Sequence, residues 1–450
     1  MSDSIASVSP RASQWPHALS DPMLWIGAII GFVPVFAGLI FRTYSYHVAP
    51  DAAEILRQLD VPFILAELAV ILWAHHSGMR FHPILRQVDR PARLAIAVFL
   101  GTFWLSSAFI SENAGYSMIR ASFWFIHIAF GVAVFHLIGA AQREGLMRFG
   151  AGLCAGFILF LPLMAVHLLY APDPAEVVGG KIIWSSAIPG NLSIRHLGIW
   201  AALVLALAIG ALHVRDHGET DFCLCLALIF IAVATLCWSG TRSGIYGVAG
   251  AWLVLLVTIR ALLPLRTAAV TFAVTGVGVW VSTWWLPPDP SFGIFDLELY
   301  ASRGVEDFAH GRMVLWTSML NAFAGSPLLG VGEGAVHWIA ETGNMHHVQP
   351  HNSVVQMLSS WGLIACLAAA YLMARLMILI HRLARRDPIM VPLALMMNCL
   401  LIMSLADGVL YFSRFIMWFA AGAAVALAVA ARRGELNPSH PQPEPSVPAR

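Results

Sequence analysis

The chain has 450 residues, of which 59% are hydrophobic and only 11% are charged, and its formal net charge at pH 7 is +1. Soluble domains carry about 25% charged residues, so this much apolar surface exceeds what an aqueous core absorbs, and lipid must surround most of the chain. The balanced charge, without a basic block, argues against a nucleic-acid partner. All six cysteines lie in apolar segments, where they are expected to be small buried hydrophobes.

Apolar runs long enough to cross about 30 Å of hydrocarbon recur along the whole chain. They predict twelve transmembrane helices, at about 23–41, 60–76, 94–111, 118–141, 148–169, 197–214, 222–238, 243–260, 268–286, 353–380, 389–406 and 415–431. We therefore expect an all-α polytopic membrane protein, with nine helices in residues 23–286 and three in residues 353–431. Residues 1–22 form a cytoplasmic tail in this scheme. The Pro-rich end, over 432–450, is too polar to pack and is expected to be disordered.

Arginines gather in alternate connections between the predicted helices, and this bias sets the orientation of the chain in the membrane. With the N-terminus inside, the inner connections hold Arg80, Arg86, Arg90, Arg93, Arg143, Arg148, Arg215, Arg260, Arg266, Arg382, Arg385, Arg386, Arg432 and Arg433. The outer connections hold fewer basic residues, chiefly Arg57, Lys181, Arg195, Arg242, Arg303, Arg312 and Arg414. Because the bias holds from end to end, both termini are expected in the cytoplasm.

Two of the outer connections are long, at 170–196 and 287–352. A structureless loop as long as the second is unusual in a compact protein, so we expect short helices and a function in it. Within it, apolar residues recur at helical spacing, at Met313, Trp316, Leu320 and Phe323. This pattern predicts an amphipathic helix lying on the membrane surface. The SPLLGVGEG stretch that follows, over 326–334, predicts a tight turn.

The first candidate catalytic group lies at the end of the longer loop, directly before a predicted helix. Asn352 is a natural N-cap, and the free N–H groups of the first helical turn create a positive end. That end disfavours a protonated imidazole, so His351 is expected to be neutral and able to accept a proton. Two other interpretations remain open. The four polar residues of this stretch, His346, His347, His351 and Asn352, also suit a lipid–water boundary. His347 and His351 have metal-ligand spacing as well, although Pro350 prevents a helix across them.

The second set of candidates consists of arginines on the outer side, where the positive-inside bias predicts few. Arg242 lies in an SGTRSG stretch whose small residues let a lipid phosphate approach the backbone closely. Arg195 opens the helix after the loop at 170–196, and Arg312 opens the surface helix. Because guanidinium binds phosphate oxygens in a bidentate manner, these arginines, with Lys181 beside them, indicate a pyrophosphate-bearing lipid as ligand.

Blander interpretations exist for the charged residues on this side. A single interfacial arginine can snorkel to the membrane surface without binding any ligand. Loop carboxylates are solvated by default, and the sequence assigns no role to the acidic residues on this side: Glu306, Glu333 and Asp407.

Taken in order, these motifs resemble the O-antigen ligase/polymerase superfamily. They are Gly311-Arg312, Trp316, the SPLLGVGEG turn, His351-Asn352 and the following QMLSSWGLIA. Upstream, SGTRSG resembles the Ser-Arg-Gly element of that family, with Thr241 where a serine usually precedes the arginine. The stretch QMLSSWG also lacks the acidic residue often found before the glycine. As an ordered combination the resemblance is specific, whereas no single motif would be.

The resemblance implies a glycosyltransferase of the GT-C type in the bacterial inner membrane, facing the periplasm and using neither a metal nor a cofactor. Its donor would be an undecaprenyl-diphosphate-linked glycan, and its acceptor the lipid A core, a growing polysaccharide or a protein hydroxyl. His351 matches the essential histidine of the family, as general base or as the group that orients the acceptor. The arginines expected to bind the diphosphate are Arg195, Arg242 and Arg312. The residues expected to support them are Asn352, His347 and Lys181.

The sequence leaves alternatives for the function. No segment stands out as a protein-docking module, so an O-antigen ligase or polymerase is favoured over a protein O-oligosaccharyltransferase. A twelve-helix transporter or glycan flippase is the alternative from another class. A transporter of two halves should show a long central cytoplasmic loop, whereas the central loop at 215–221 is short and the longest loop lies outside. A purely structural scaffold would not explain the outer arginines.

Overall fold

The computed structural model describes residues 21–40, 60–138, 143–170, 177–178, 181–182, 188–190, 192–214, 218–284, 312–335, 339 and 350–436. Its elements in chain order are α2 (Pro22–Ile40), α4 (Val61–His76), α5 (Phe81–Gln87), α6 (Arg90–Phe109), α7 (Ala114–Ile138), α8 (Arg143–Tyr170), β1 (Val177–Val178), β2 (Lys181–Ile182), α9 (Ile194–Ala211), α10 (Glu219–Trp238), α11 (Arg242–Ile259), α12 (Leu265–Ser282), α15 (Ser353–Arg386), η2 (Pro388–Met390), α16 (Val391–Ala406), η3 (Val409–Tyr411) and α17 (Ser413–Arg432). A further helix covers 312–325.

Eleven helices among these residues are long and apolar enough to cross a membrane. The remaining expected span, at 60–76, corresponds to α4, an apolar helix of 16 residues. The all-α polytopic architecture is therefore confirmed, and the only sheet in the described residues is the antiparallel pair of β1 and β2. A tight turn joins α10, which ends at Trp238, to α11, which begins at Arg242.

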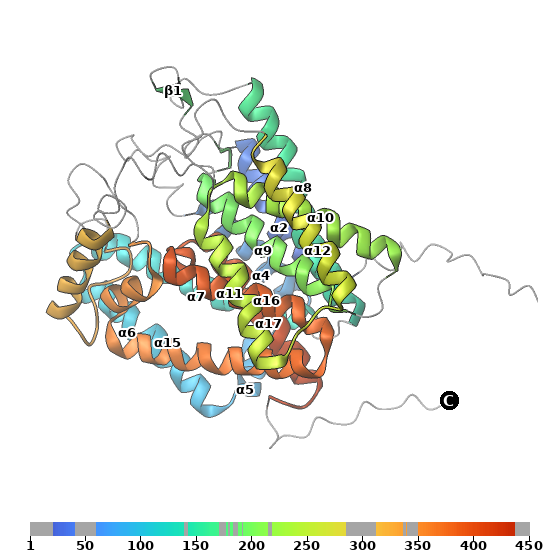
Figure 1. Cartoon of the computed structure of the whole chain (residues 1–450). Helices are drawn as coiled ribbons and strands as arrows, with labels where there is room; N and C mark the ends of the chain where they lie inside the picture. The colour runs from blue at the N-terminus through green and yellow to red at the C-terminus, as the bar shows by residue number, and fades with distance from the viewer. Residues whose placement is uncertain are drawn as a thin grey trace, which may run out of the picture.

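Helices α9, α16 and α17 are the most enclosed, and α12 is the least enclosed of the membrane-crossing helices. A helix that is apolar on all sides fits such a central position, because it can bury every face against its neighbours. Figure 1 shows α6 and α15 side by side at one edge of the molecule, with α10 and α12 toward the opposite edge. The candidate site residues lie at the ends of the central helices that the predicted topology places on the outer side.

Helices α2 and α8 pack backbone against backbone through two pairs of glycines at four-residue spacing. A Cβ atom at Gly156 would lie 1.8 Å from the carbonyl oxygen of Gly31, and one at Gly152 would lie 2.6 Å from a backbone nitrogen of α2. Small residues at such spacing let membrane helices approach closely, because lipid supplies no hydrophobic force between them. Gly27 makes an equally close approach to α8. Contact between these two helices therefore requires glycine.

Replacing Gly156 by leucine should separate α2 from α8 and strongly destabilise the protein. Overpacking a well-packed core costs about 1–3 kcal/mol, and here the backbone itself would have to move. The measurement is the amount of full-length protein in membranes and its thermal unfolding temperature in detergent. Gly150→Leu, on the same helix with open space around its Cβ position, is the matched control. Equal loss in both variants would contradict this account of the packing.

A helix is present within the longer loop where one was expected, over 312–325, but it buries a different face from the one that the spacing indicated. Leu315 and Met319 are buried against Val355 of α15, whereas Met313 and Leu320 are more than 40% exposed. The helix is apolar on more than one side, so the spacing in the sequence did not distinguish the face that packs on α15. This helix therefore holds its first residue, Arg312, close to the start of α15.

Candidate active site

Asn352 fixes the position of His351 at the beginning of α15. Asn352 is the N-cap of this helix: its side-chain oxygen accepts hydrogen bonds from the backbone N–H groups of Val354 and Val355, at 2.9 and 3.1 Å. Its Nδ2 donates to the carbonyl oxygen of Leu405, at 3.0 Å. Asn352 thereby joins the start of α15 to the last turn of α16. His351 itself has a left-handed backbone, with φ of 54°, a strained conformation of the kind that clusters at functional sites.

The residue that follows α16, Asp407, reaches His351. The Nδ1 atom of His351 and the Oδ1 atom of Asp407 are 3.2 Å apart. The backbone N–H of Gly408 donates to the same carboxylate oxygen, at 2.9 Å. Burial raises the pKa of Asp407, but its hydrogen bond with His351 and the nearby charge of Arg195 lower it, and the net pKa lies below the ordinary value. Asp407 is therefore an ionised acceptor at neutral pH.

This pairing decides which nitrogen of His351 carries the proton. A carboxylate only accepts hydrogen bonds, so Nδ1 must be the donor, and in the neutral ring Nε2 is then the unprotonated nitrogen. The side chain of His351 is about one-fifth exposed, at 21%, whereas that of Asp407 is 9% exposed. The arrangement suits an imidazole that accepts a proton at Nε2, with its orientation held from behind by a buried acid.

Two of the three candidate arginines lie within electrostatic reach of this pair. Arg195 is an exposed residue in the first turn of α9, and its charge contributes to lowering the pKa of Asp407. Arg312 is half-buried at the start of the helix over 312–325. Its pKa is lowered by burial and then by the positive charge of Arg195, while Asp407 acts in the opposite direction. Two neighbouring guanidinium groups with one nearby acid form a place where an anion is favoured.

Arg242, the third candidate, lies at the same end of the bundle. It is the first residue of α11, directly after the tight turn. A Cβ atom at Gly198 would lie 2.0 Å from Oγ1 of Thr241, so this turn packs on α9 one helical turn beyond Arg195. Helix α11 also packs along α16, whose outer end leads to the acid of the pair. The sequence-predicted arginines therefore approach the same region from three separate elements.

Several of the residues considered from the sequence lie outside what the structure describes, and three of them bear on the candidate site. They are His346, His347 and Glu306. Lys181 belongs to β2, paired with Val178, and its side chain is outside the described part. A metal site through His347 and His351 is therefore untested. Within the described residues, no group of three or more histidine, cysteine or acidic side chains is placed to hold a metal ion.

The SPLLGVGEG turn docks into a break in α15. Gly362 interrupts this helix with a φ of 69°, which leaves backbone groups on both sides without helical partners. The turn supplies them: the N–H groups of Val331 and Gly332 donate to the carbonyls of Ser359 and Ser360, at 2.9 and 3.0 Å. In return, the N–H of Leu363 donates to the carbonyl of Pro327, at 2.8 Å.

The close approach at this break requires two glycines. A Cβ atom at Gly330 would lie 2.6 Å from the backbone nitrogen of Gly362, and one at Gly362 would lie 2.4 Å from the carbonyl oxygen of Leu328. Both glycines have positive φ, of 71° and 69°, which other residues adopt only at a cost. The two glycine-containing motifs thus form one interlocked structure that fixes the outer half of α15, and with it His351.

Glu333, at the end of this turn, is a buried anchor and not a solvated loop carboxylate. Its Oε2 accepts a hydrogen bond from Nε1 of Trp361, at 2.6 Å, and its Oε1 is 3.6 Å from a guanidinium nitrogen of Arg120. Its backbone N–H donates a hydrogen bond to the hydroxyl of Ser107, and its carbonyl oxygen accepts one from the hydroxyl of Ser117. Arg120 lies within the apolar run of α7, and an arginine inside a membrane span is the sequence signal that could have indicated a buried acidic partner.

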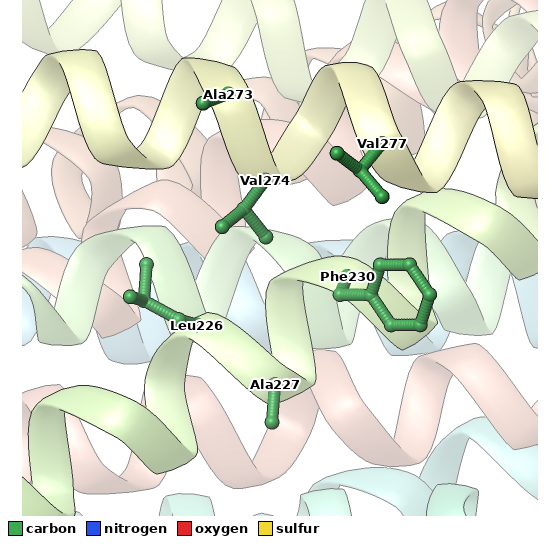
Figure 2. A pocket seen from close by; sticks show the side chains of 6 residues that line it. All are labelled: Leu226, Ala227, Phe230, Ala273, Val274 and Val277. Carbon is green, nitrogen blue, oxygen red and sulfur yellow. The ribbon is translucent and has the colours of Figure 1, made fainter.

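An apolar groove between α10 and α12 does not contribute to this chemistry. Figure 2 shows the side chains that line it: Leu226, Ala227, Phe230, Ala273, Val274 and Val277. None of them carries a polar group, so the groove can contact only apolar groups such as lipid chains.

Comparison with known proteins adds one finding. A family model described as O-antigen ligase matches residues 227–370. No curated protein matches the chain. The matched stretch contains Arg242, Arg312 and His351, whereas Arg195 and Asp407 lie outside it. The arrangement around His351 therefore combines residues from the matched stretch with residues from before and after it.

Proposed function

The chain belongs to the O-antigen ligase-like superfamily, and we propose that it transfers a glycan from undecaprenyl diphosphate to an acceptor hydroxyl at the periplasmic face of the bacterial inner membrane. The observation that carries this proposal is the His351–Asp407 pair within electrostatic reach of Arg195 and Arg312. A proton acceptor beside an anion-binding surface meets both needs of such a transfer: a nucleophile to activate and a charged leaving group to stabilise.

In the proposed reaction, the acceptor oxygen attacks the anomeric carbon while the bond from that carbon to the diphosphate oxygen breaks. The proton of the acceptor hydroxyl passes to Nε2 of His351, and the bonding electron pair leaves with the diphosphate. A single displacement of this kind inverts the configuration at the anomeric carbon. Asp407 stabilises the imidazolium that forms, because its carboxylate already accepts the hydrogen bond that the Nδ1–H group donates.

Arg195, Arg242 and Arg312 would neutralise the charge that builds on the departing diphosphate. Guanidinium groups present paired donors that match phosphate oxygens, and they keep their charge at every physiological pH. In this proposal they replace the divalent cation that many diphosphate-using enzymes employ. Asn352 supports the site by fixing the start of α15.

For the acceptor, we propose the lipid A core, which would make the protein an O-antigen ligase. A growing polysaccharide, which would make it a polymerase, is the second candidate, because the superfamily that the motifs resemble includes polymerases as well as ligases. A protein hydroxyl is less favoured because no segment stands out as a protein-docking module. The family match gives the transporter interpretation no support.

Deleting the gene in the source bacterium and separating its lipopolysaccharide on a gel tests the proposal. Loss of all O-antigen with an intact core indicates a ligase, whereas a band with a single repeat indicates a polymerase. Reintroduced wild-type protein should restore the pattern. Arg242→Ala should lower the rate of transfer by about 10²-fold, the effect of removing one donor from a developing negative charge.

The proposal is wrong if His351→Ala and Arg242→Ala both leave transfer unimpaired at normal protein level. An unchanged glycan pattern in the deletion strain, without a second gene of the family, would contradict it as well.

A further inference from the structure

A buried ion pair joins the outer ends of two helices beside the candidate site. Asp60, the N-cap residue of α4, and Arg414, in the first turn of α17, are 1% and 3% exposed. The Nη2 atom of Arg414 donates to Oδ1 of Asp60, and its Nε lies 3.4 Å from Oδ2. Asp60 adopts a left-handed backbone, with φ of 53°. The chain therefore accepts both strain and the burial of two charges at this point.

The same guanidinium also reaches a third helix. Nη1 of Arg414 lies 3.3 Å from Nδ1 of His196, and because arginine only donates, Nδ1 must be the acceptor. The backbone N–H of Ser193 donates to that Nδ1 as well, at 3.3 Å, as part of the capping box that begins α9. The ring of His196 packs edge-on against Phe412, with ring centroids 4.4 Å apart. One side chain thus ties the outer ends of α4, α9 and α17 together.

These contacts bear on both halves of the candidate site. His196 follows Arg195 directly, so holding His196 fixes the helical turn that carries Arg195. Arg414 lies directly after the short connection that begins with Asp407 and contains η3. Holding Arg414 in place therefore fixes the end of the connection that carries Asp407. The ring of Phe412, within that connection, lies against His196. This cluster therefore helps to set the separation between the His351–Asp407 pair and Arg195, in addition to the direct packing of α9 on α16.

We propose that Arg414, Asp60 and His196 form a positioning brace that holds Arg195 at the correct distance from the His351–Asp407 pair. They are positioning residues, because none of them needs to touch substrate. The inference rests on the proposed function for the identity of the bound group, a polyprenyl diphosphate. It extends the site to the first part of the chain, since Asp60 lies far before the stretch that the O-antigen ligase family model matches.

The chain contains a matched control for this brace. Glu67 lies seven residues after Asp60 on α4, and both its carboxylate oxygens bond to Nδ1 of His127 in α7, at 2.9 and 2.7 Å. Both side chains are buried, at 0% and 3% exposed. This pair is as buried as the brace, and within the described residues its hydrogen bonds join only Glu67 and His127 and do not reach His351, Asp407 or Arg195. Breaking it should cost stability without changing the positions of the site residues.

The experiment uses the full-length protein in lipid nanodiscs, with undecaprenyl diphosphate as the probe. Asp60→Asn and Arg414→Gln should weaken binding of the probe about tenfold, a change of about 1.4 kcal/mol. Glu67→Gln should change binding by less than about twofold, even where it lowers the thermal unfolding temperature as much as the two brace variants do. Arg414→Lys keeps the charge beside Asp60 but lacks the planar fork that also reaches His196. It should restore most of the unfolding temperature while binding stays weak.

Three results would overturn the brace. In the first, Asp60→Asn and Arg414→Gln bind the probe as tightly as Glu67→Gln does, at a similar unfolding temperature. The second is full recovery of binding together with stability in Arg414→Lys. The third is failure of all the brace variants, but not of Glu67→Gln, to accumulate in membranes, which would make the cluster purely structural. Failure of the proposed function is separate: His351→Ala would then retain glycan transfer in cells, a readout independent of probe binding.

Discussion

His351→Ala should lower the rate of glycan transfer by about 10²–10⁴-fold, the range that general-base catalysis supplies. The variant loses the imidazole that Asp407 holds through the hydrogen bond at Nδ1. Binding of the diphosphate donor should change little, because the arginines remain. The measurement is the initial rate of transfer in membranes that contain wild-type and variant protein at equal level.

His82→Ala provides the control for this substitution. His82 is an exposed histidine in α5, on the inner side of the membrane in the predicted topology, and its replacement should leave the rate unchanged. A rate for His351→Ala within about threefold of the wild type would remove His351 from the reaction.

Asp407→Asn should also lower the rate by about 10²–10⁴-fold, although it removes no group that touches substrate. The amide of asparagine can donate a hydrogen bond to Nδ1 of His351, and this would favour the tautomer with its proton on Nε2. A protonated Nε2 cannot accept the proton of the acceptor hydroxyl. The rate of transfer and the amount of folded protein, measured together, check the prediction.

The pH dependence of the wild-type protein follows from the same carboxylate. The pKa of Asp407 lies below its ordinary value, so the stability that its ionised form contributes is present at neutral pH and is lost only as the pH falls through that lowered pKa. Between about pH 5 and 8 the group stays charged. A change of rate in this window should therefore not arise from Asp407.

Asp89→Asn is the matched control for Asp407→Asn. Asp89 accepts hydrogen bonds from Arg375 and from the first turn of α6, and its pKa is lowered chiefly by Arg375. It lies on the inner side in the predicted topology, so its replacement should leave transfer unchanged. If Asp407→Asn and Asp89→Asn lowered the rate to the same small extent, the pair with His351 would have no part in the chemistry.

Apolar periodicity and length were sufficient to predict the helices. Every predicted span coincides with a helix in the described residues, within a few residues at each end. The predicted span at 353–380 ends before the helix does, since α15 continues to Arg386. Its last turns carry charged residues, which were not counted in an apolar span. The break at Gly362 was not predicted. A glycine in an apolar run is compatible with a continuous helix, and only the docked SPLLGVGEG turn makes the break favourable.

The pattern of charges was less informative about pairing. From the sequence, Glu333 and Asp407 were considered only as loop acids without a role, yet both are buried in the structure. Glu333 contacts Trp361 and Arg120, and Asp407 contacts His351. The signals were present but weak: an arginine within an apolar span, and an acid directly after the end of a predicted helix. Neither signal identifies the residue that the acid contacts, because that residue belongs to another part of the chain.

The sequence by itself determined that lipid surrounds the chain, where its helices lie, and that histidine, arginine and glycine motifs gather near one set of helix ends. These properties follow from composition and local spacing, which are readable without long-range contacts. The tertiary structure alone decided that Asp407 orients His351, across 56 residues, and that Asp60 holds Arg414, across 354 residues. Such pairs form because distant helices pack at one depth, and the free energy of that packing comes from the whole bundle and not from any single segment.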